Sequence, residues 1–378
     1  MQIIKVNSKY VNIIFEIGIW IHLLIMSVGY GEWSIPYQGR LLQIAFGLFA
    51  IKILMTYYSK KEWVILLAIG VLGVVSYLFT RDEYVLSVLV MIFAAKSTDM
   101  RQICKRILVV ASIATMVIAV LSLFGVGGIP VDVRDYGRGG VESRWCFGFG
   151  HANNIHGTVW YLISLVVYVF HDKLNWKHYS GMTVLNIVLF YLTGSRGGFI
   201  AMQAVIVFAA LLPYYDAIGR KSLGYILCAC EIIGVTLLSI VSAMIPFEEH
   251  PILAIPDRLS TGRLHLAYWY ADISKWNIFA SGGELKAIDN GWVVMFFSYG
   301  YVIGALFVLF HLYLLYRIWK QRNGLLLAIL MTSVFYTFME ATYMTNPTYL
   351  LSNLSYIVAM LLLSDKKEQE NESGKLEN

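Results

Sequence analysis

Apolar segments of about 20 residues recur along almost the whole chain, and this pattern limits the fold more than any other feature. Each of them is long enough to cross a lipid bilayer as an α-helix. Of the 378 residues, 58% are hydrophobic and only 14% are charged, whereas an average soluble domain carries about 25% charged residues. Short segments of strictly alternating polarity, which are typical of a membrane β-barrel, do not occur. The sequence therefore predicts an all-α, polytopic membrane protein.

We expect about 12 transmembrane helices, with both termini on the cytoplasmic side. The predicted spans are 10–29, 41–58, 63–80, 84–95, 107–127, 155–170, 180–193, 199–215, 223–245, 291–316, 324–342 and 349–363. The fourth and seventh spans are short, so that ten or eleven spans are an alternative. No cleavage pattern follows the first span, which predicts a retained helix and not a signal peptide. Residues 1–363 would form a single membrane domain, and residues 364–378 a charged cytoplasmic tail.

Lysine and arginine are distributed differently over the two predicted sides. Thirteen lysines fall inside and only Lys275 and Lys286 fall outside, as the positive-inside rule requires. Five arginines are expected inside. The eight expected outside are Arg40, Arg81, Arg134, Arg138, Arg144, Arg196, Arg258 and Arg263. Because guanidinium groups bind phosphate bidentately and ammonium groups do not, the outer arginines are candidates for an anion site. The alternative is that they pair with outer acids such as Asp132 and Glu142.

The large outer loop between the ninth and tenth spans, 246–290, is the strongest candidate for function, because loops on a rigid scaffold often carry it. Ser260 or Thr261 is expected to cap a short amphipathic helix that begins near Gly262. One face of this helix would carry the apolar residues Leu264, Ala267, Tyr268, Ala271 and Ile278. We expect the helix to lie along the membrane surface. Its start would present Arg258 and Arg263 to a lipid-linked phosphate, and a plain amphipathic lid is the alternative.

Two further outer segments carry arginine among glycines. Residues 129–154 contain Arg138, Arg144 and several glycines, which permit positive φ and close approach of backbone amides to an anion. This segment lacks the lysine pattern of a P-loop, which disfavours nucleotide binding. Residues 193–198 form a tight turn with Arg196 at its centre, suited either to a lipid head group or to membrane anchoring. We expect Arg196, Arg258 and Arg263 to form one anion site.

Ionisable residues within the apolar segments are functional candidates by default. They are Glu16, Lys52, Glu231 and Glu340. For Glu231 we expect a role in buried hydrogen bonding. The histidines show no HExxH pattern, and the spacing of His151 and His156 does not suit two ligands on one helix face. Metal catalysis is therefore not expected.

Several of these elements, in this order, resemble the Wzy-type polysaccharide polymerases, which are relatives of the O-antigen ligases. The matching segments are Cys146–Asn153, Thr193–Arg196, Leu259–Arg263, Asp289–Asn290 and Tyr299–Gly300. The resemblance covers about residues 120–310 and lies in the order and topology of the segments. The chain carries Ala152 where the family often has proline.

This resemblance implies a GT-C-like, metal-independent glycosyltransferase without a cofactor. Such an enzyme polymerises oligosaccharide repeat units that are linked to undecaprenyl pyrophosphate, on the outer leaflet of the cytoplasmic membrane. A flippase and a chain-length regulator are candidate partners, and nucleic acid is not. Transfer of the same glycan to another acceptor, as by an O-antigen ligase, remains open, as does a 12-helix polysaccharide transporter.

The expected site combines the outer arginines with the matching segments. The expected catalytic residues are Arg263, with His265 or His151 as the base. The expected substrate-binding residues are Arg258, Arg196, Arg144, Arg138, Asn153, Asp289 and Asn290.

Overall fold

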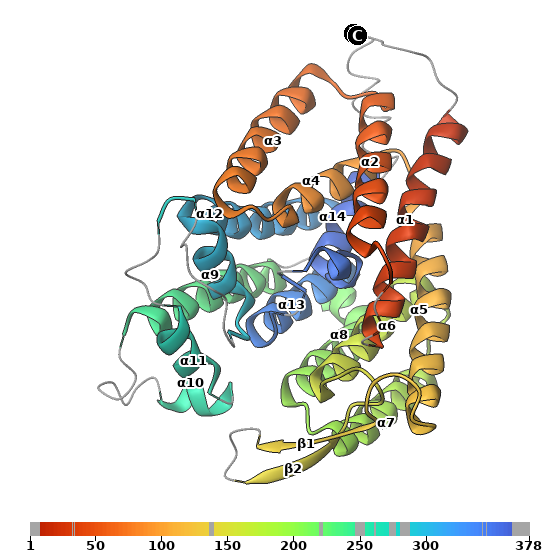
Figure 1. Cartoon of the computed structure of the whole chain (residues 1–378), viewed down its shortest axis with the longest axis vertical. Helices are drawn as coiled ribbons and strands as arrows, with labels where there is room; N and C mark the ends of the chain where they lie inside the picture. Colours follow the sequence, from red (N-terminus) through yellow and green to blue (C-terminus); the bar gives the residue numbers. More distant parts are fainter. Residues whose placement is uncertain are drawn as a thin grey trace.

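The computed structural model describes residues 8–31, 33, 35–135, 140–218, 222–245, 254–260, 262–271, 277–279, 288–341, 343–344 and 346–364. Apart from one two-stranded hairpin, the regular structure of these residues is helical (Figure 1). The predicted all-α class is therefore confirmed. The tail 364–378 lies outside the described residues except for Ser364, and so does much of the outer loop 246–290.

The order of the helices follows the order of the predicted spans. The elements are α1 (Ser8–Tyr30), α2 (Gln38–Met55), α3 (Lys60–Thr80), α4 (Tyr84–Ala94), α5 (Met100–Leu123), β1 (Val131–Asp135), β2 (Val141–Trp145), α6 (Ala152–Phe170), η1 (His171–Lys173), α7 (Trp176–Thr193), α8 (Arg196–Ile218), α9 (Leu223–Met244), α10 (Ala254–Leu259), α11 (Arg263–Tyr270), α12 (Gly291–Gln321), α13 (Gly324–Met339), η5 (Pro347–Ser352) and α14 (Leu354–Ser364). Each predicted span overlaps one α-helix, the last span also overlaps η5, and α10 and α11 occupy the predicted outer loop.

Six helices are long and apolar enough to cross a membrane, namely α1, α2, α3, α5, α9 and α12. Four shorter helical segments are also apolar, in α4, α8, α13 and α14. On α3 the apolar side chains of Val64, Leu67, Val71 and Leu78 are exposed at the surface of the protein. Because soluble proteins rarely expose such contiguous apolar surface, these helices identify a membrane protein.

Helix α12 consists of two helical pieces that meet at Gly300, where φ is 81° and ψ is 175°. The ring of Trp292, before the break, lies 5.0 Å from the rings of both Phe307 and His311, after it. In a straight helix, residues 292 and 311 would be about 28 Å apart at 1.5 Å per residue. The first piece therefore folds back along the second. The predicted single span 291–316 does not describe this segment in full, because residues 291–299 form a separate piece.

Glycine is needed at the break because a Cβ atom on Gly300 would lie 2.6 Å from the carbonyl O of Ile278. Amides lose their helical acceptors where a helix breaks, and they need other partners. The amides of Tyr301 and Val302 donate to the carbonyl O atoms of Asn277 (3.0 Å) and Ile278 (3.1 Å). Residues 277–279 of the outer loop are thereby fixed to α12.

Strands β1 and β2 form an antiparallel hairpin in the segment that was expected to be a glycine-rich loop, and β2 packs against α7. In Figure 1 the hairpin lies at the lower end of the view. Asp132 pairs with Arg144 and Arg134 with Glu142 in the register, so that all four charges lie on one face. Val133, on the opposite face, is exposed. Sequence patterns did not reveal the hairpin because charged and apolar residues alternate over only five residues in each strand.

Candidate functional site

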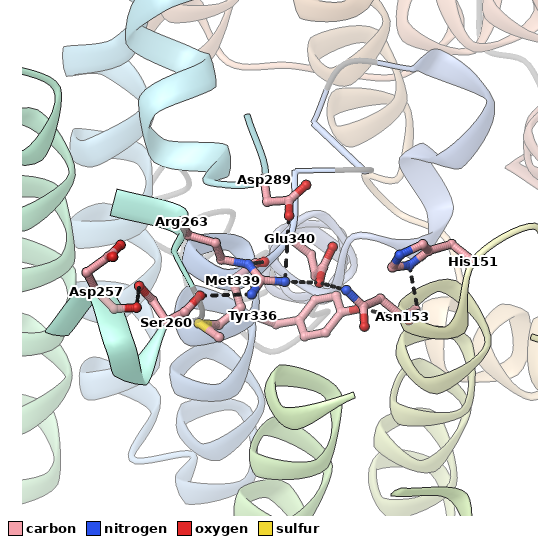
Figure 2. Close-up of polar contacts among 9 residues, drawn as sticks. All are labelled: His151, Asn153, Asp257, Ser260, Arg263, Asp289, Tyr336, Met339 and Glu340. Carbon is pink, nitrogen blue, oxygen red and sulfur yellow. Dashed lines mark hydrogen bonds and ion pairs between the residues drawn. The ribbon is translucent and has the colours of Figure 1, made fainter. Parts of the chain in front are cut away.

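The ends of several helices meet around the buried side chain of Arg263, the first residue of α11 (Figure 2). Its Nε donates to the carbonyl O of Met339, the last residue of α13. Its Nη1 donates to the carbonyl O of Ser260 at 2.9 Å, and its Nη2 donates to Oε1 of Glu340 at 2.6 Å. All three guanidinium nitrogens are therefore fixed in direction, and the group is held rigidly.

Glu340 is the buried carboxylate of the site. It follows directly after α13, and its side chain is only 7% exposed. Its Oε1 also accepts a hydrogen bond from Nδ2 of Asn153, at 2.6 Å, in the first turn of α6. Burial raises the pKa of Glu340 from 4.5 to about 7, although Arg263 and Asn153 both favour the charged form. The carboxyl group therefore holds a proton more tightly than a glutamate in water does.

Asp289 lies on the more accessible side of Arg263. Its side chain is 48% exposed, and its Oδ2 lies 3.8 Å from Nη2 of Arg263. The neighbouring Asn290 is fully buried and caps α12, since its Oδ1 accepts from the amides of Trp292 and Val293. The Nδ2 of Asn290 donates to the Ser239 hydroxyl of α9 at 2.9 Å. Asp289 and Asn290 were both predicted to bind substrate, and of these two neighbours only Asp289 faces the Arg263 guanidinium.

The N-terminus of α11 is capped differently from what the sequence predicted. Oδ1 of Asp257, in α10, accepts hydrogen bonds from the amides of Leu264 (3.1 Å) and His265 (3.0 Å). The Ser260 hydroxyl donates to the carbonyl O of Asp257 instead, and Thr261 lies outside the described residues. A carboxylate is favoured at this end of a helix by the macrodipole. Asp257 therefore fixes the turn that aims Arg263 at the site.

The predicted apolar face of this helix is confirmed for Leu264 and Ala267 on α11 and for Ala271 directly after it, all of which are buried. Tyr268 is partly buried. Ile278 is exposed and does not belong to this face, because α11 ends at Tyr270. Packing of this face positions the start of α11 beside α9, which α11 contacts.

The two predicted histidines occupy different places. His151 caps α6, and its Nδ1 accepts a hydrogen bond from the Asn153 amide at 3.1 Å. Burial, together with the positive charge of Arg134, lowers the pKa of His151 below 6.5. His265 follows Arg263 by two residues, which is roughly 200° around the helix. Its ring lies 5.3 Å from the ring of Trp269 and not among the contacts of Glu340.

Two of the other predicted arginines are exposed, unlike the buried Arg263, and a third lies outside the described residues. Arg196 begins α8 and is exposed. A Cβ atom on the next residue, Gly197, would lie 3.1 Å from Cβ of Met339, so that the start of α8 adjoins the end of α13. Arg258 is exposed on α10, and Arg138 lies outside the described residues.

The alternative that outer arginines pair with outer acids is confirmed on the hairpin. Arg134 lies 2.5 Å from a carboxylate oxygen of Asp132, and Arg144 lies 2.5 Å from one of Glu142. Arg144 is buried, and it packs against the turn after α7, where its Nε would lie 3.2 Å from a Cβ atom on Gly194. The hairpin arginines are therefore held by carboxylates within the described structure.

Sequence reasoning marked Glu340 as an ionisable residue in a predicted span but did not connect it with Arg263. Among the other residues marked in this way, Glu16 pairs with Arg106, and Lys52 donates to the carbonyl O of Lys96 at 2.8 Å. The expected hydrogen bonding of Glu231 is not seen for its buried Oε2, which has no hydrogen-bond partner in the described part of the chain. The position of an ionisable residue in an apolar segment was the signal that marked Glu340. Its partner, Arg263, could not be inferred from the spacing of residues in the sequence.

No group of three or more His, Cys, Asp or Glu side chains that could hold a metal ion occurs among the described residues. No protein-family model, no curated protein and no solved structure matches this chain.

Proposed function

We propose that this chain is a polysaccharide polymerase of the cytoplasmic membrane, which polymerises undecaprenyl-pyrophosphate-linked oligosaccharide repeat units on the outer leaflet. The observation that carries the proposal is the buried guanidinium of Arg263, which four contacts fix at the meeting point of helix ends, beside the half-exposed side chain of Asp289. The sequence resemblance to Wzy-type polymerases supplies the substrate class.

The chemistry of the leaving group supports this role for Arg263. When the glycosidic bond to the lipid breaks, negative charge grows on a diphosphate oxygen, and a preorganised donor at that point stabilises the transition state. Guanidinium is suited to this task because it binds phosphate through two parallel N–H groups. The starts of α6, α8 and α11 adjoin the same place, and helix N-termini favour anions.

The proposal includes a topology and a set of partners. We propose about twelve membrane-crossing segments, one for each predicted span, in a GT-C-like arrangement with both termini cytoplasmic. Helices α10 and α11 then lie at the outer surface. A flippase supplies the substrate, a chain-length regulator acts with the enzyme, and neither metal nor cofactor takes part.

The function is tested with purified protein in lipid nanodiscs and a lipid-linked repeat unit, in EDTA and without nucleotide sugar. We expect a ladder of longer lipid-linked products, and none with Arg263→Ala. Strict dependence on a divalent ion would contradict the metal-free mechanism. Transfer only to a different acceptor would favour the ligase alternative, and movement of the lipid-linked unit across vesicle membranes without extension would favour the transporter.

The topology is tested by cysteine labelling with an impermeant reagent, on a background without the native cysteines. Trp269, on α11, and Trp176, at the start of α7, are both exposed. We expect Trp269→Cys to be labelled in intact cells and Trp176→Cys only after lysis. The reverse pattern would refute the proposed sidedness.

A further inference from the structure

In the part of the chain that the structure describes, the carboxylates that contact Arg263 outnumber the cations that contact them. Glu340 lies 2.6 Å and Asp289 3.8 Å from the same nitrogen, Nη2 of Arg263. When both acids are ionised, this three-residue cluster carries one net negative charge. A carboxylate that shares a single cation in a desolvated place holds a proton more tightly than one in water. The cluster therefore contains a carboxylate that could accept a proton, next to Arg263, the candidate anion-binding group.

The two carboxylates differ in their surroundings. Glu340 is buried and contacts Arg263 and Asn153, whereas about half of the Asp289 side chain is exposed to solvent. The charged or titratable groups that act on Glu340 are Arg263, from α11, and Asp289, before α12. Tyr336 and Tyr343 also lie close enough to interact with it. Only Arg263 among these groups is a cation, so that the basicity of Glu340 depends on where that guanidinium is directed.

A bound diphosphate and Glu340 would compete for Arg263. The Nε and Nη1 groups donate to backbone carbonyl oxygens, whereas Nη2 faces the two carboxylates. A diphosphate that enters from the half-exposed side of Asp289 meets Nη2 first. Once Nη2 turns to the phosphate, Glu340 loses its cation, and its proton affinity rises because burial still disfavours the charged form.

We propose that Glu340 is the general base of the transfer, and that the donor diphosphate releases it by taking over the Arg263 guanidinium. This inference rests on the proposed function. It gives the enzyme a base that becomes strong only when the donor is bound.

In this step the acceptor hydroxyl oxygen forms a bond to the anomeric carbon of the donor sugar, and the bond from that carbon to the diphosphate oxygen breaks. The electron pair of the broken bond stays on the diphosphate, next to Arg263. The hydroxyl proton passes to the Glu340 carboxylate and leaves to solvent after the product departs.

His151 and His265 are less suited to this task. The Nδ1 of His151 already accepts the Asn153 amide as the cap of α6. The side chain of His265 is directed roughly 200° away from that of Arg263 on α11. Glu340 is in direct contact with the group that would hold the leaving diphosphate, so that a base there lies near the reacting carbon.

The first test is binding, which needs no turnover. Inorganic pyrophosphate binding to purified protein in nanodiscs is measured by calorimetry for the wild type, Glu340→Gln and Arg263→Ala. Competition predicts that Glu340→Gln binds roughly threefold to tenfold more tightly, which corresponds to about one decade or less in affinity. Arg263→Ala should lose binding. Weaker binding by Glu340→Gln would overturn the competition and assign Glu340 a purely structural role.

The second test is the pH dependence of the initial rate of extension. At saturating donor, the wild-type rate should fall with decreasing pH from a value above about 7, because loss of the Arg263 guanidinium raises the pKa of Glu340 above its value of about 7 in the free enzyme, and a protonated carboxyl group cannot accept the proton. Glu340→Gln should be about a hundredfold to ten-thousandfold slower and should lose this acid limb. Glu340→Asp, which keeps the charge but reaches less far, should be slow and keep the limb. Glu16→Gln, in the ion pair with Arg106, is the matched control and should resemble the wild type.

The results separate the two proposals. An unchanged rate and acid limb in a folded Glu340→Gln would refute the base. If no variant extends the lipid-linked unit but Glu340→Gln still binds pyrophosphate more tightly, the polymerase function fails while the competition for Arg263 stands. If the wild type binds no pyrophosphate, the competition for Arg263 fails, and the extension assay alone decides the polymerase function.

Discussion

The side chains of Arg263 and Glu340 are 8% and 7% exposed, whereas those of Arg106 and Glu16, which form the ion pair between α5 and α1, are 39% and 34% exposed. The guanidinium of Arg263 also donates to two backbone carbonyl groups, and Glu340 also accepts from Asn153. Both pairs join residues that are far apart in the sequence. They differ in how much water the charges lose.

This difference in burial distinguishes an ion pair that can take part in a reaction from one that only links two surface side chains. Removing two charges from water costs several kcal/mol for each ion, and additional hydrogen bonds are needed to offset the loss. A half-exposed pair loses little hydration and stabilises a protein by about 0–1 kcal/mol. The buried pair is therefore weak evidence for stability, but it keeps a guanidinium and a carboxylate in fixed and reactive positions.

The largest effect is expected from breaking the buried pair. Arg263→Ala leaves Glu340 buried without its cation and should destabilise the protein by about 3–5 kcal/mol. Arg106→Ala should cost about 1 kcal/mol or less. Thermal unfolding in the same detergent measures both. Equal losses in the two variants would contradict the distinction drawn from burial.

Replacing both residues of the buried pair should restore much of the stability that Arg263→Ala loses. In Arg263→Met combined with Glu340→Leu, no charge remains buried, and the double variant should be about 2–4 kcal/mol more stable than Arg263→Ala. It should still fail to extend lipid-linked repeats. A stable double variant with wild-type activity would show that neither residue takes part in the reaction.

Keeping the charge while changing its shape should have a smaller effect. Lysine cannot replace the three separate N–H directions that Arg263 uses. A lost hydrogen bond to a charged partner is worth about 1.5–3 kcal/mol, so that Arg263→Lys should slow turnover about tenfold to a hundredfold.

Arg40 is the control for this substitution, because it is exposed and lies over the ring of Tyr37. Polymer length and amount in a deletion strain that carries each variant, with membrane levels checked by immunoblot, provide the measurement. Arg40→Lys should match the wild type. Equal impairment of Arg40→Lys and Arg263→Lys would indicate a general effect of outer charge.

A further effect concerns the pH dependence of stability. The pKa of Glu340 is about 7 in the folded protein, against an ordinary value of 4.5 for a glutamate in water. The folded protein therefore binds more protons between these values, and the contribution of Glu340 to stability is present below pH 4.5 and lost as the pH rises through 7. Glu340→Gln should flatten the unfolding profile over this window. A profile identical to that of the wild type would show that this carboxyl group has its ordinary pKa.

Sequence patterns predicted the helices well because apolar length alone identifies them. Each predicted span overlaps a helix, and the apolar face of α11 follows from the spacing of Leu264, Ala267 and Ala271. The outer loop was predicted to hold the site, and it supplies Arg263 and Asp289. The arginine was recognised because it lies at the start of the helix predicted in that loop, and because guanidinium groups bind phosphate bidentately.

The features that sequence patterns did not reveal are contacts between distant segments. Glu340 and Arg263 are 77 residues apart, and nothing in the spacing of either residue indicates the other. Asp257 caps α11 across an intervening turn, whereas the nearer Ser260 and Thr261 matched the usual capping pattern. The reversal at Gly300 was hidden because both pieces of α12 are apolar, and hydropathy does not record the direction of a helix.

The reversal of the chain at Gly300 makes residues 291–299 a short helical segment that is held at both ends. At one end Gly300 packs closely against the backbone of Ile278, and at the other end Asn290 is hydrogen-bonded to Ser239. A change of one residue in its length would turn Asp289 by about 100° around the helix axis and shift it by about 1.5 Å. The length of this piece is therefore tied to the site, although none of its residues belongs to the Arg263 cluster.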